Sequence, residues 1–330
     1  MFMFQRENEP KIGMSQYSFE RYMSFESELG VSIGYKQIGF LSVAVEKKAL
    51  DALRMAKLRQ ELGVRTEIMG PEDVRKLVPV VNTSDILVGV FGPEDGIIDA
   101  NAIMLGYKDG AQRYGVEICQ GREYEAIGIQ VDRDRVTGVD TRSGSVSTEN
   151  VVNAAGADAI EVGSWVGIAL PIMNRRRSVF VTEPFPDIPD DTPLVEDAEM
   201  EWYYRKEGPG VLIGMGKEES LDISMTPNWD FLPEVIEFAI HRVPILENAR
   251  LDRKKGWSGI RSLTPDICPI IGPIDTVQGF FNSCGWGGEG IMHAPAGGQL
   301  VAECIVDGQT STLNIVPFLA SRFTEGFDLL

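Results

Sequence analysis

The sequence predicts a protein of the mixed α/β or α+β class, with two lobes whose segments interleave along the chain. The first reason is length, because 330 residues correspond to about two domains at roughly 150 residues per domain. The second is that helical and strand-like periodicities both occur, without a strict alternation of strand and helix. A hydrophobic fraction of 43% and a charged fraction of 24% are typical of a globular protein and exclude a largely disordered chain.

The first third of the chain is mainly helical in pattern. Apolar residues recur at helical spacing from Met14 to Leu29, and Gly30 follows as a stop signal. Pro71 indicates another helix start, since proline suits the first turn. The remaining elements expected in this part are a strand at 39–45, helices at 50–62 and 100–114, and a turn at 92–96.

Short strands become more frequent beyond residue 115. Residues 150–156 are expected to form a buried strand that ends in small side chains. Four prolines within 184–193 predict a loop, because proline cannot donate a backbone hydrogen bond. The other elements expected here are strands at 116–118, 126–131, 136–141, 201–205, 210–214 and 279–281, a hairpin turn at 132–135, and helices at 160–166 and 232–246.

Charge and composition exclude several classes of function. Lys and Arg total 31 against 49 Asp and Glu, a net charge of -18 that disfavours binding to nucleic acid or to an anionic membrane surface. No apolar run approaches the roughly 20 residues that a membrane span needs. The four cysteines show no CxxC spacing, which fits a reduced, cytoplasmic setting, and with two histidines in the chain no metal site is expected.

A glycine-rich segment is the first candidate for chemistry. Residues 285–290 read G-W-G-G-E-G, which matches G-x-G-x-x-G, and they follow an apolar strand and precede a helical pattern. Only 40 residues follow Gly290, too few for the rest of a dinucleotide-binding sheet. Bare backbone N–H groups at a helix start still favour partial negative charge. The alternative is a tight turn in which the glycines serve packing alone.

Two further places carry candidate side chains. Arg261 lies between apolar neighbours, where a guanidinium either pairs with a carboxylate of the protein or binds an anionic ligand. Tyr203 and Tyr204 precede Arg205 in a strand pattern, so one tyrosine should face the site and the other should face away. Packing is the alternative interpretation for both tyrosines.

Three motifs, taken in order, resemble those of the D-amino-acid-oxidase-like FAD-dependent oxidoreductases. They are N-A-A-G at 153–156, G-I-R-x-x-T-P-D-x-x-P-I-I-G at 259–272, and G-W-G-G-E-G-I-M-H-A-P-A-G-G at 285–298. The branch that they resemble contains sarcosine oxidase β-subunits, glycine oxidases and dimethylglycine dehydrogenases. The order of elements from Ser15 onward is similar as well, so the resemblance covers nearly the whole chain.

The resemblance implies a two-lobe fold, FAD as cofactor, and oxidation of a carbon–nitrogen bond. It places 1–34, 92–170 and 262–330 in an FAD lobe and 35–91 with 171–261 in a substrate lobe. Arg261 is expected to hold the substrate carboxylate, with help from Tyr203 or Tyr204. The residues implied at the cofactor are Ala154, Ala155, Gly156, Gly285, Gly287, Gly288, Glu289, Gly290, Ile291 and Met292.

One departure from the family pattern concerns the N-terminus. Members of the family begin with a strand, a G-x-G-x-x-G turn, a helix and a strand that ends in an acid for the ADP ribose. No such unit precedes Ser15 in this sequence. The expectation is therefore an incomplete FAD lobe that retains the part around the flavin ring and the substrate, and a chain that purifies with little FAD.

The function expected from this resemblance is oxidation of an amino acid or N-methyl amino acid by hydride transfer to flavin, with oxygen or a partner subunit as the electron acceptor. Two alternatives stay open. One is oxidation of a 2-hydroxy acid, because an arginine-held carboxylate beside a flavin serves both chemistries. The other is a truncated, non-catalytic subunit that binds a partner.

Overall fold

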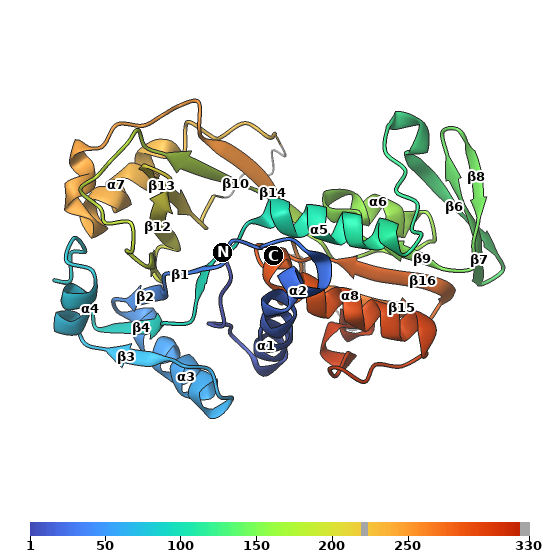
Figure 1. The fold of residues 1–330 in the computed structure, drawn as a ribbon, viewed down its shortest axis with the longest axis horizontal. Helices are drawn as coiled ribbons and strands as arrows, with labels where there is room; N and C mark the ends of the chain where they lie inside the picture. The colour runs from blue at the N-terminus through green and yellow to red at the C-terminus, as the bar shows by residue number, and fades with distance from the viewer. Residues whose placement is uncertain (219–223, 324–330) are drawn as a thin grey trace. The chain divides into compact units, whose positions relative to one another are not determined.

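The computed structural model describes residues 1–218 and 224–323. The chain divides into two compact units, and Figure 1 labels their helices and strands. Each unit combines three separate segments of the sequence, so the interleaving expected from the sequence is present. Unit 1 contains 1–12, 35–98 and 175–260, and unit 2 contains 13–34, 99–174 and the residues from Arg261 onward.

The sheets form most of the framework. The strands are β1 (Lys36–Gln37), β2 (Phe40–Ala44), β3 (Glu67–Met69), β4 (Val88–Gly92), β5 (Gly96–Ile97), β6 (Ala126–Asp132), β7 (Arg135–Thr141), β8 (Gly144–Ser147), β9 (Val151–Asn153), β10 (Met173–Val181), β11 (Leu194–Asp197), β12 (Trp202–Glu207), β13 (Gly210–Met215), β14 (Trp257–Leu263), β15 (Ile270–Ile274) and β16 (Val277–Cys284). The α-helices are α1 (Glu9–Met23), α2 (Phe25–Leu29), α3 (Lys47–Glu61), α4 (Pro71–Leu77), α5 (Ala100–Arg113), α6 (Ala159–Ser164), α7 (Leu232–Arg242) and α8 (Gly290–Val306). This mixture confirms the predicted fold class.

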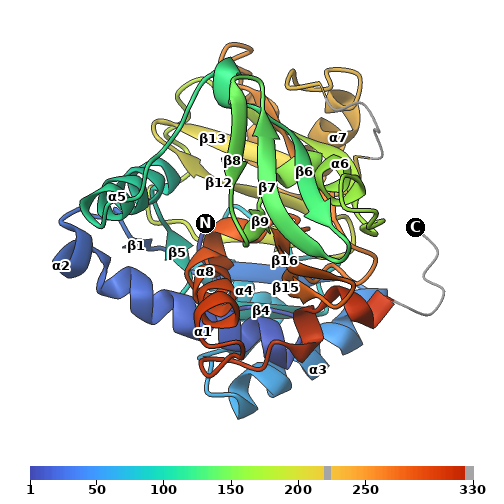
Figure 2. The same cartoon turned by 90° about the vertical axis from the view of Figure 1, so that its right-hand side faces the viewer.

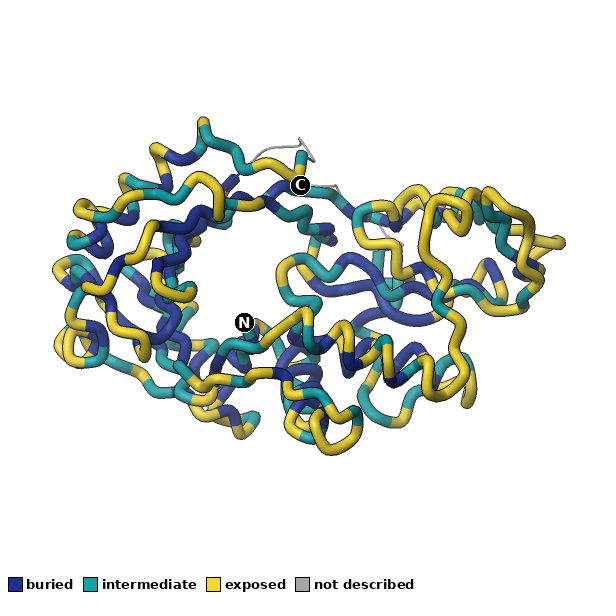
Figure 3. Tube along the Cα trace, turned by 45° about the horizontal axis from the view of Figure 1, so that its top comes forward, coloured by how far each residue is buried: buried dark blue, intermediate teal, exposed yellow. Residues whose placement is uncertain are grey.

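Unit 1 is organised by a mixed sheet in the order β14-β10-β13-β12-β11-β2-β4-β3. Its core lies where α4 and α7 contact the sheet, and Trp202 and Tyr204 are fully buried there. Every residue of β13 is buried, and this strand lies inside the sheet with β10 on one side and β12 on the other. In Figure 3 the buried residues run along such interior strands, while loops and helix surfaces are exposed.

Unit 2 is organised by a second sheet, in the order β15-β16-β7-β6. β9 pairs parallel to β16, with Asn153 opposite Asn282, and β8 pairs with β7. Helix α8 contacts β15 and β16, and one apolar cluster joins Met14 of α1 to Ala296 and Leu300 of α8. Figure 2 shows α1 and α8 next to one another beside these strands.

The N-terminal residues depart from the expected boundaries. Residues 1–12, expected in the same lobe as 13–34, belong to unit 1. The backbone N–H of Phe4 donates to Asp95 Oδ1 at 2.6 Å, and Arg59 Nε donates to the carbonyl of Arg6 at 2.9 Å. No local sequence pattern indicates these contacts, because they join segments that are far apart in the chain. The assignment of the units to flavin and substrate stays a prediction.

Several predicted elements differ from the structure in detail. The helix expected at 14–29 begins at Glu9 and is interrupted at Ser24. The helix expected at 232–246 ends at Arg242 because Pro244 lacks the N–H that would continue it, and a 3-10 turn follows. Residues 116–118 form no strand. The strand expected at 150–156 is only three residues long, and Val152 within it is exposed.

The loop predicted at 184–193 is confirmed, since these residues contain neither helix nor strand. Within 1–218 and 224–323, no helix combines the length and the apolar character that crossing a membrane requires.

Candidate functional site

The glycine-rich segment connects β16 to α8 within unit 2. Gly285 and Gly287 have φ angles of +70° and +57°, a conformation that side chains with a Cβ rarely adopt, whereas Gly288 lies outside that region. The indole of Trp286 lies over Gly297, where a Cβ would come within 2.4 Å of the ring. Its Nε1 donates to the carbonyl of Ser283 at 2.9 Å. These contacts fix the segment, which we call the glycine loop (285–290), at the start of the helix.

The first turn of α8 presents unsatisfied backbone donors. Glu289 N–H donates to the carbonyl of Trp286 and Met292 N–H donates to that of Glu289. Among the described residues, the N–H groups of Gly290 and Ile291 have no acceptor, and both residues are half-buried. The positive end of a 17-residue helix lies at the same place. This turn is therefore suited to bind an anion or a polarised carbonyl oxygen.

Arg261 lies on β14, directly against the glycine loop. Ser258 and Ser262 are buried, so the alternation of the strand directs Arg261 to its other face. A Cβ placed on Gly288 would lie 2.9 Å from the guanidinium carbon of Arg261. No carboxylate of the described residues pairs with this half-buried arginine, and none of their oxygens accepts a hydrogen bond from it. The first of the two interpretations drawn from the sequence, an ion pair with a protein carboxylate, is thus not found within the described chain.

A chain of hydrogen bonds joins the three sequence motifs. Gly287 N–H donates to the carbonyl of Ser262 at 2.9 Å, and Ser262 Oγ donates to Asn174 Oδ1 at 2.8 Å. Asn174 Nδ2 in turn donates to the carbonyl of Ala157 at 2.8 Å. The N-A-A-G turn, the Arg261 strand and the glycine loop are therefore held together within unit 2. Asn174 was missed by the sequence analysis because an isolated asparagine in a strand carries no motif.

The small residues after β9 form an exposed turn. Asn153 is buried, and its Nδ2 donates to the carbonyl of Ala159 at 3.0 Å and to Asn282 Oδ1 at 3.3 Å. Ala154, Ala155 and Gly156 are exposed, and Gly156 has a φ of +59°. The asparagine thus fixes the strand end, and the three residues that follow are exposed.

The T-P-D part of the second motif has a structural role. Thr264 Oγ1 donates to the carbonyl of Cys268 at 2.6 Å, and Asp266 accepts hydrogen bonds from Arg322 and from Cys268 N–H. Burial raises the pKa of Asp266, but the hydrogen bonds from Arg322, Cys268 N–H and Thr264, together with the charge of Arg322, outweigh it and hold the pKa below its usual range. These contacts close the turn that leads from β14 into β15.

The two candidate tyrosines lie in unit 1 and differ in burial. Tyr204 is 0% exposed in the core against Trp202, and burial raises its pKa. Tyr203 lies on the opposite face of β12 and is half-buried, with its ring over Gly214 of the adjacent strand. The alternation expected from the sequence is present. Of the two, only Tyr203 keeps surface that is available to a ligand, and its role stays a prediction.

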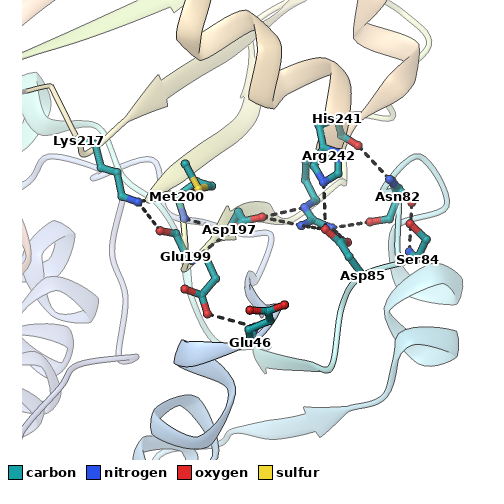
Figure 4. Close-up of polar contacts among 10 residues, drawn as sticks. All are labelled: Glu46, Asn82, Ser84, Asp85, Asp197, Glu199, Met200, Lys217, His241 and Arg242. Carbon is teal, nitrogen blue, oxygen red and sulfur yellow. Dashed lines mark hydrogen bonds and ion pairs between the residues drawn. The ribbon is translucent and has the colours of Figure 1, made fainter.

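Unit 1 contains a separate charged cluster that the sequence analysis did not identify (Figure 4). Arg242, at the end of α7, donates to Asp197 at 2.7 Å, to Asp85 at 2.7 Å and to the carbonyl of Asn82 at 2.7 Å. His241 Nε2 lies 3.0 Å from Asp85 Oδ2. A cavity of about 390 Å³ is bordered by these side chains, except Asn82, together with Lys47, Glu199 and Lys217.

A family model described as FAD dependent oxidoreductase matches residues 2–304. Human mitochondrial sarcosine dehydrogenase is 29% identical over 298 residues, which cover 86% of this chain and 32% of that protein. The mitochondrial pyruvate dehydrogenase phosphatase regulatory subunit of Mus musculus is 27% identical over 314 residues, which cover 90% of this chain and 35% of that protein. The chain thus spans about a third of the length of these curated relatives.

The fold is also similar to a solved structure. L-proline dehydrogenase from P. horikoshii superimposes with a TM-score of 0.88 and 27% sequence identity, covering 98% of this chain and 86% of that one. The two-lobe architecture expected from the sequence is therefore confirmed, and it includes both units described above.

Proposed function

We propose that this chain, which belongs to the FAD dependent oxidoreductase family, oxidises the carbon–nitrogen bond of a small amino acid or N-methyl amino acid. A mitochondrial sarcosine dehydrogenase and an L-proline dehydrogenase are among the proteins to which it is similar. The observation that carries the proposal is the position of Arg261, a cation without a partner among the described residues and in contact with the glycine loop.

The glycine loop fits the flavin end of FAD. The N–H groups of Gly290 and Ile291 have no acceptor among the described residues and lie at the positive end of α8. They can donate hydrogen bonds to the polarised oxygens of the flavin pyrimidine ring and favour negative charge there. When bound, FAD supplies the acceptor for the hydride. The glycine loop, by this proposal, binds and orients that acceptor.

Arg261 supplies the substrate-binding charge. Its planar guanidinium can hold a carboxylate through two parallel N–H···O bonds, which fixes both the position and the orientation of a small acid. Its contact with Gly288 places this cation next to the glycine loop. A substrate held by its carboxylate would then present its α-carbon near the same loop, so this one anchor accounts for a preference for small carboxylic acids substituted at the α-carbon.

A spectroscopic titration tests the proposal. The purified protein is incubated with excess FAD, freed of unbound FAD by gel filtration, and mixed without oxygen with sarcosine, glycine, alanine or proline. We expect the visible flavin band to bleach with at least one of these, and not with glycolate or lactate. The Arg261→Ala variant, loaded with FAD in the same way, controls for bleaching that does not involve the anchor. Faster bleaching by a hydroxy acid than by the amino acid of the same skeleton would overturn the choice of substrate.

A second candidate is a regulatory, non-catalytic role. Among the relatives is a protein named as a regulatory subunit, at an identity close to that of the dehydrogenase. The same titration separates the two functions, because a non-catalytic subunit leaves the flavin band unchanged with every substrate. Protein that retains no FAD after gel filtration would also favour this second candidate.

A further inference from the structure

Helix α8 contains a proline in its second turn. Pro295 has no N–H, so the carbonyl of Ile291, four residues earlier, has no partner at the position from which a helix normally supplies one. A proline in a helix interior is destabilising in general, partly for this reason. The affected carbonyl belongs to the first turn of α8, next to the open N–H groups described above.

Helix α1 supplies the missing donor. The hydroxyl of Tyr22 donates to the carbonyl of Ile291. Ser18 Oγ accepts from Ala296 N–H at 3.2 Å, and Ser15 Oγ lies 3.0 Å from His293 Nε2. Burial raises the pKa of Tyr22, so its hydroxyl stays protonated and available as a donor. Three polar side chains of one helix therefore meet backbone or side-chain groups of the other around Pro295.

These three side chains form one face of α1. Residues 15, 18 and 22 are spaced by three and four, which aligns them on a helix, and each is at most 2% exposed. Buried hydroxyls are costly unless they are hydrogen-bonded, so their presence in an otherwise apolar contact needs a reason. Packing of Met14 against Ala296 and Leu300 already holds the two helices together. The polar contacts also fix the orientation of one peptide group in the first turn of α8, because hydrogen bonds are directional.

The same contacts extend toward the glycine loop. Glu289 is the last residue before α8, and its Oε2 lies 3.8 Å from His293 Nδ1. His293 is 0% exposed and meets Ser15 through its other ring nitrogen. A continuous series of side chains thus joins α1 to the residue that precedes the open N–H groups.

We propose that Tyr22 is a positioning residue, whose hydroxyl replaces the hydrogen bond that Pro295 removes and thereby holds the first turn of α8 in place for its ligand. The identity of that ligand as flavin rests on the proposed function. The position of the turn itself does not, and it can be measured without any ligand.

The test is a double-mutant cycle on amide exchange. Tyr22→Phe keeps the buried ring and removes only the hydroxyl, and we expect hydrogen exchange of the amides in 290–300 to rise about fivefold, the effect of one net hydrogen bond of about 1 kcal/mol. Pro295→Ala supplies a new N–H for the carbonyl of Ile291. In the double variant we therefore expect exchange to return toward that of the wild type.

Tyr17→Phe is the matched control, because Tyr17 lies on the same helix and its hydroxyl has no hydrogen-bond partner among the described residues. Exchange in Tyr22→Phe equal to that in the Tyr17→Phe control overturns the proposal. So does a double variant that exchanges as fast as Tyr22→Phe alone, since that result assigns Tyr22 a packing role.

A second arm measures the dissociation constant of FAD for the same variants by fluorescence. We expect the constant to rise about fivefold in Tyr22→Phe and to recover in the double variant, while Tyr17→Phe binds as the wild type does. Wild-type protein that fails to bind FAD counts against the proposed function, whereas the exchange cycle still decides the role of Tyr22. If amide exchange changes in Tyr22→Phe but the affinity for FAD does not, flavin is not the ligand for which this turn is positioned.

Discussion

Two arginines of this protein have opposite surroundings. Arg242 in unit 1 is almost fully buried and donates to two carboxylates and a carbonyl (Figure 4). Arg261 in unit 2 is half-buried and has no such partner among the described residues. A guanidinium whose donors are all used by the protein has little capacity to bind a ligand, while an unsatisfied one beside a glycine loop has that capacity. Arg242 is therefore structural, and Arg261 is the candidate for ligand binding.

Removing Arg242 should produce the largest change in stability. Asp197 is only 3% exposed, and without the guanidinium its charge would remain buried and unpaired. We expect Arg242→Met to lower the free energy of unfolding by about 3–5 kcal/mol, measured by urea denaturation. Arg142→Met is the control, since its ion pair with Glu125 is exposed to solvent and should contribute little to stability. A loss for Arg242→Met no larger than this control would remove the contrast between the two arginines.

Removing Arg261 should affect catalysis instead of stability. In FAD-loaded protein we expect Arg261→Ala to lower kcat/KM by about 10²-fold, equivalent to a charge-assisted contact of about 3 kcal/mol. The melting temperature and flavin content should change little. Arg261→Lys should be intermediate, because lysine keeps the charge but loses the planar fork. A large loss of stability with an unaltered KM would show that Arg261, like Arg242, is structural.

A smaller effect is expected on the pH dependence of unfolding, through Asp85, which is a partner of Arg242. Burial raises the pKa of Asp85, but the hydrogen bonds from Arg242 and His241, the charge of Arg242 and a backbone hydrogen bond together outweigh it and lower the pKa below its usual value. A carboxyl with a lowered folded-state pKa contributes stability above its unfolded pKa of about 3.9, and this contribution is lost as the pH falls through the folded value. In Asp85→Asn the free energy of unfolding should therefore decrease less steeply as the pH falls. Asp73→Asn, which breaks an exposed pair with Lys76, serves as the control, and identical curves for both variants would contradict the expectation.

The motifs of this protein can be recognised in its sequence, whereas the residues that hold the motifs in place cannot. The glycine loop and Arg261 stand out because glycine spacing and an arginine among apolar residues are visible locally. Asn174 and Ser262, which join these motifs, have no such pattern. Arg176, the middle residue of three consecutive arginines, is buried in an ion pair with Glu218 that no local pattern indicates. In each case the partner lies far away in the sequence or on another strand.

By itself the sequence determined the fold class, the interleaving of two units, the FAD dependent family and the segments that carry its motifs. The fold class and the two units follow from length and periodicity, and the family follows from the resemblance of three short motifs, so none of these properties requires knowledge of distant contacts. Only the tertiary structure decided which arginine has its donors satisfied, which tyrosine is buried, and why a proline is tolerated in α8. The hydroxyl of Tyr22 and the carbonyl of Ile291 are 269 residues apart in the chain. Hydrogen bonding and burial depend on such distant neighbours, and folding alone brings them together.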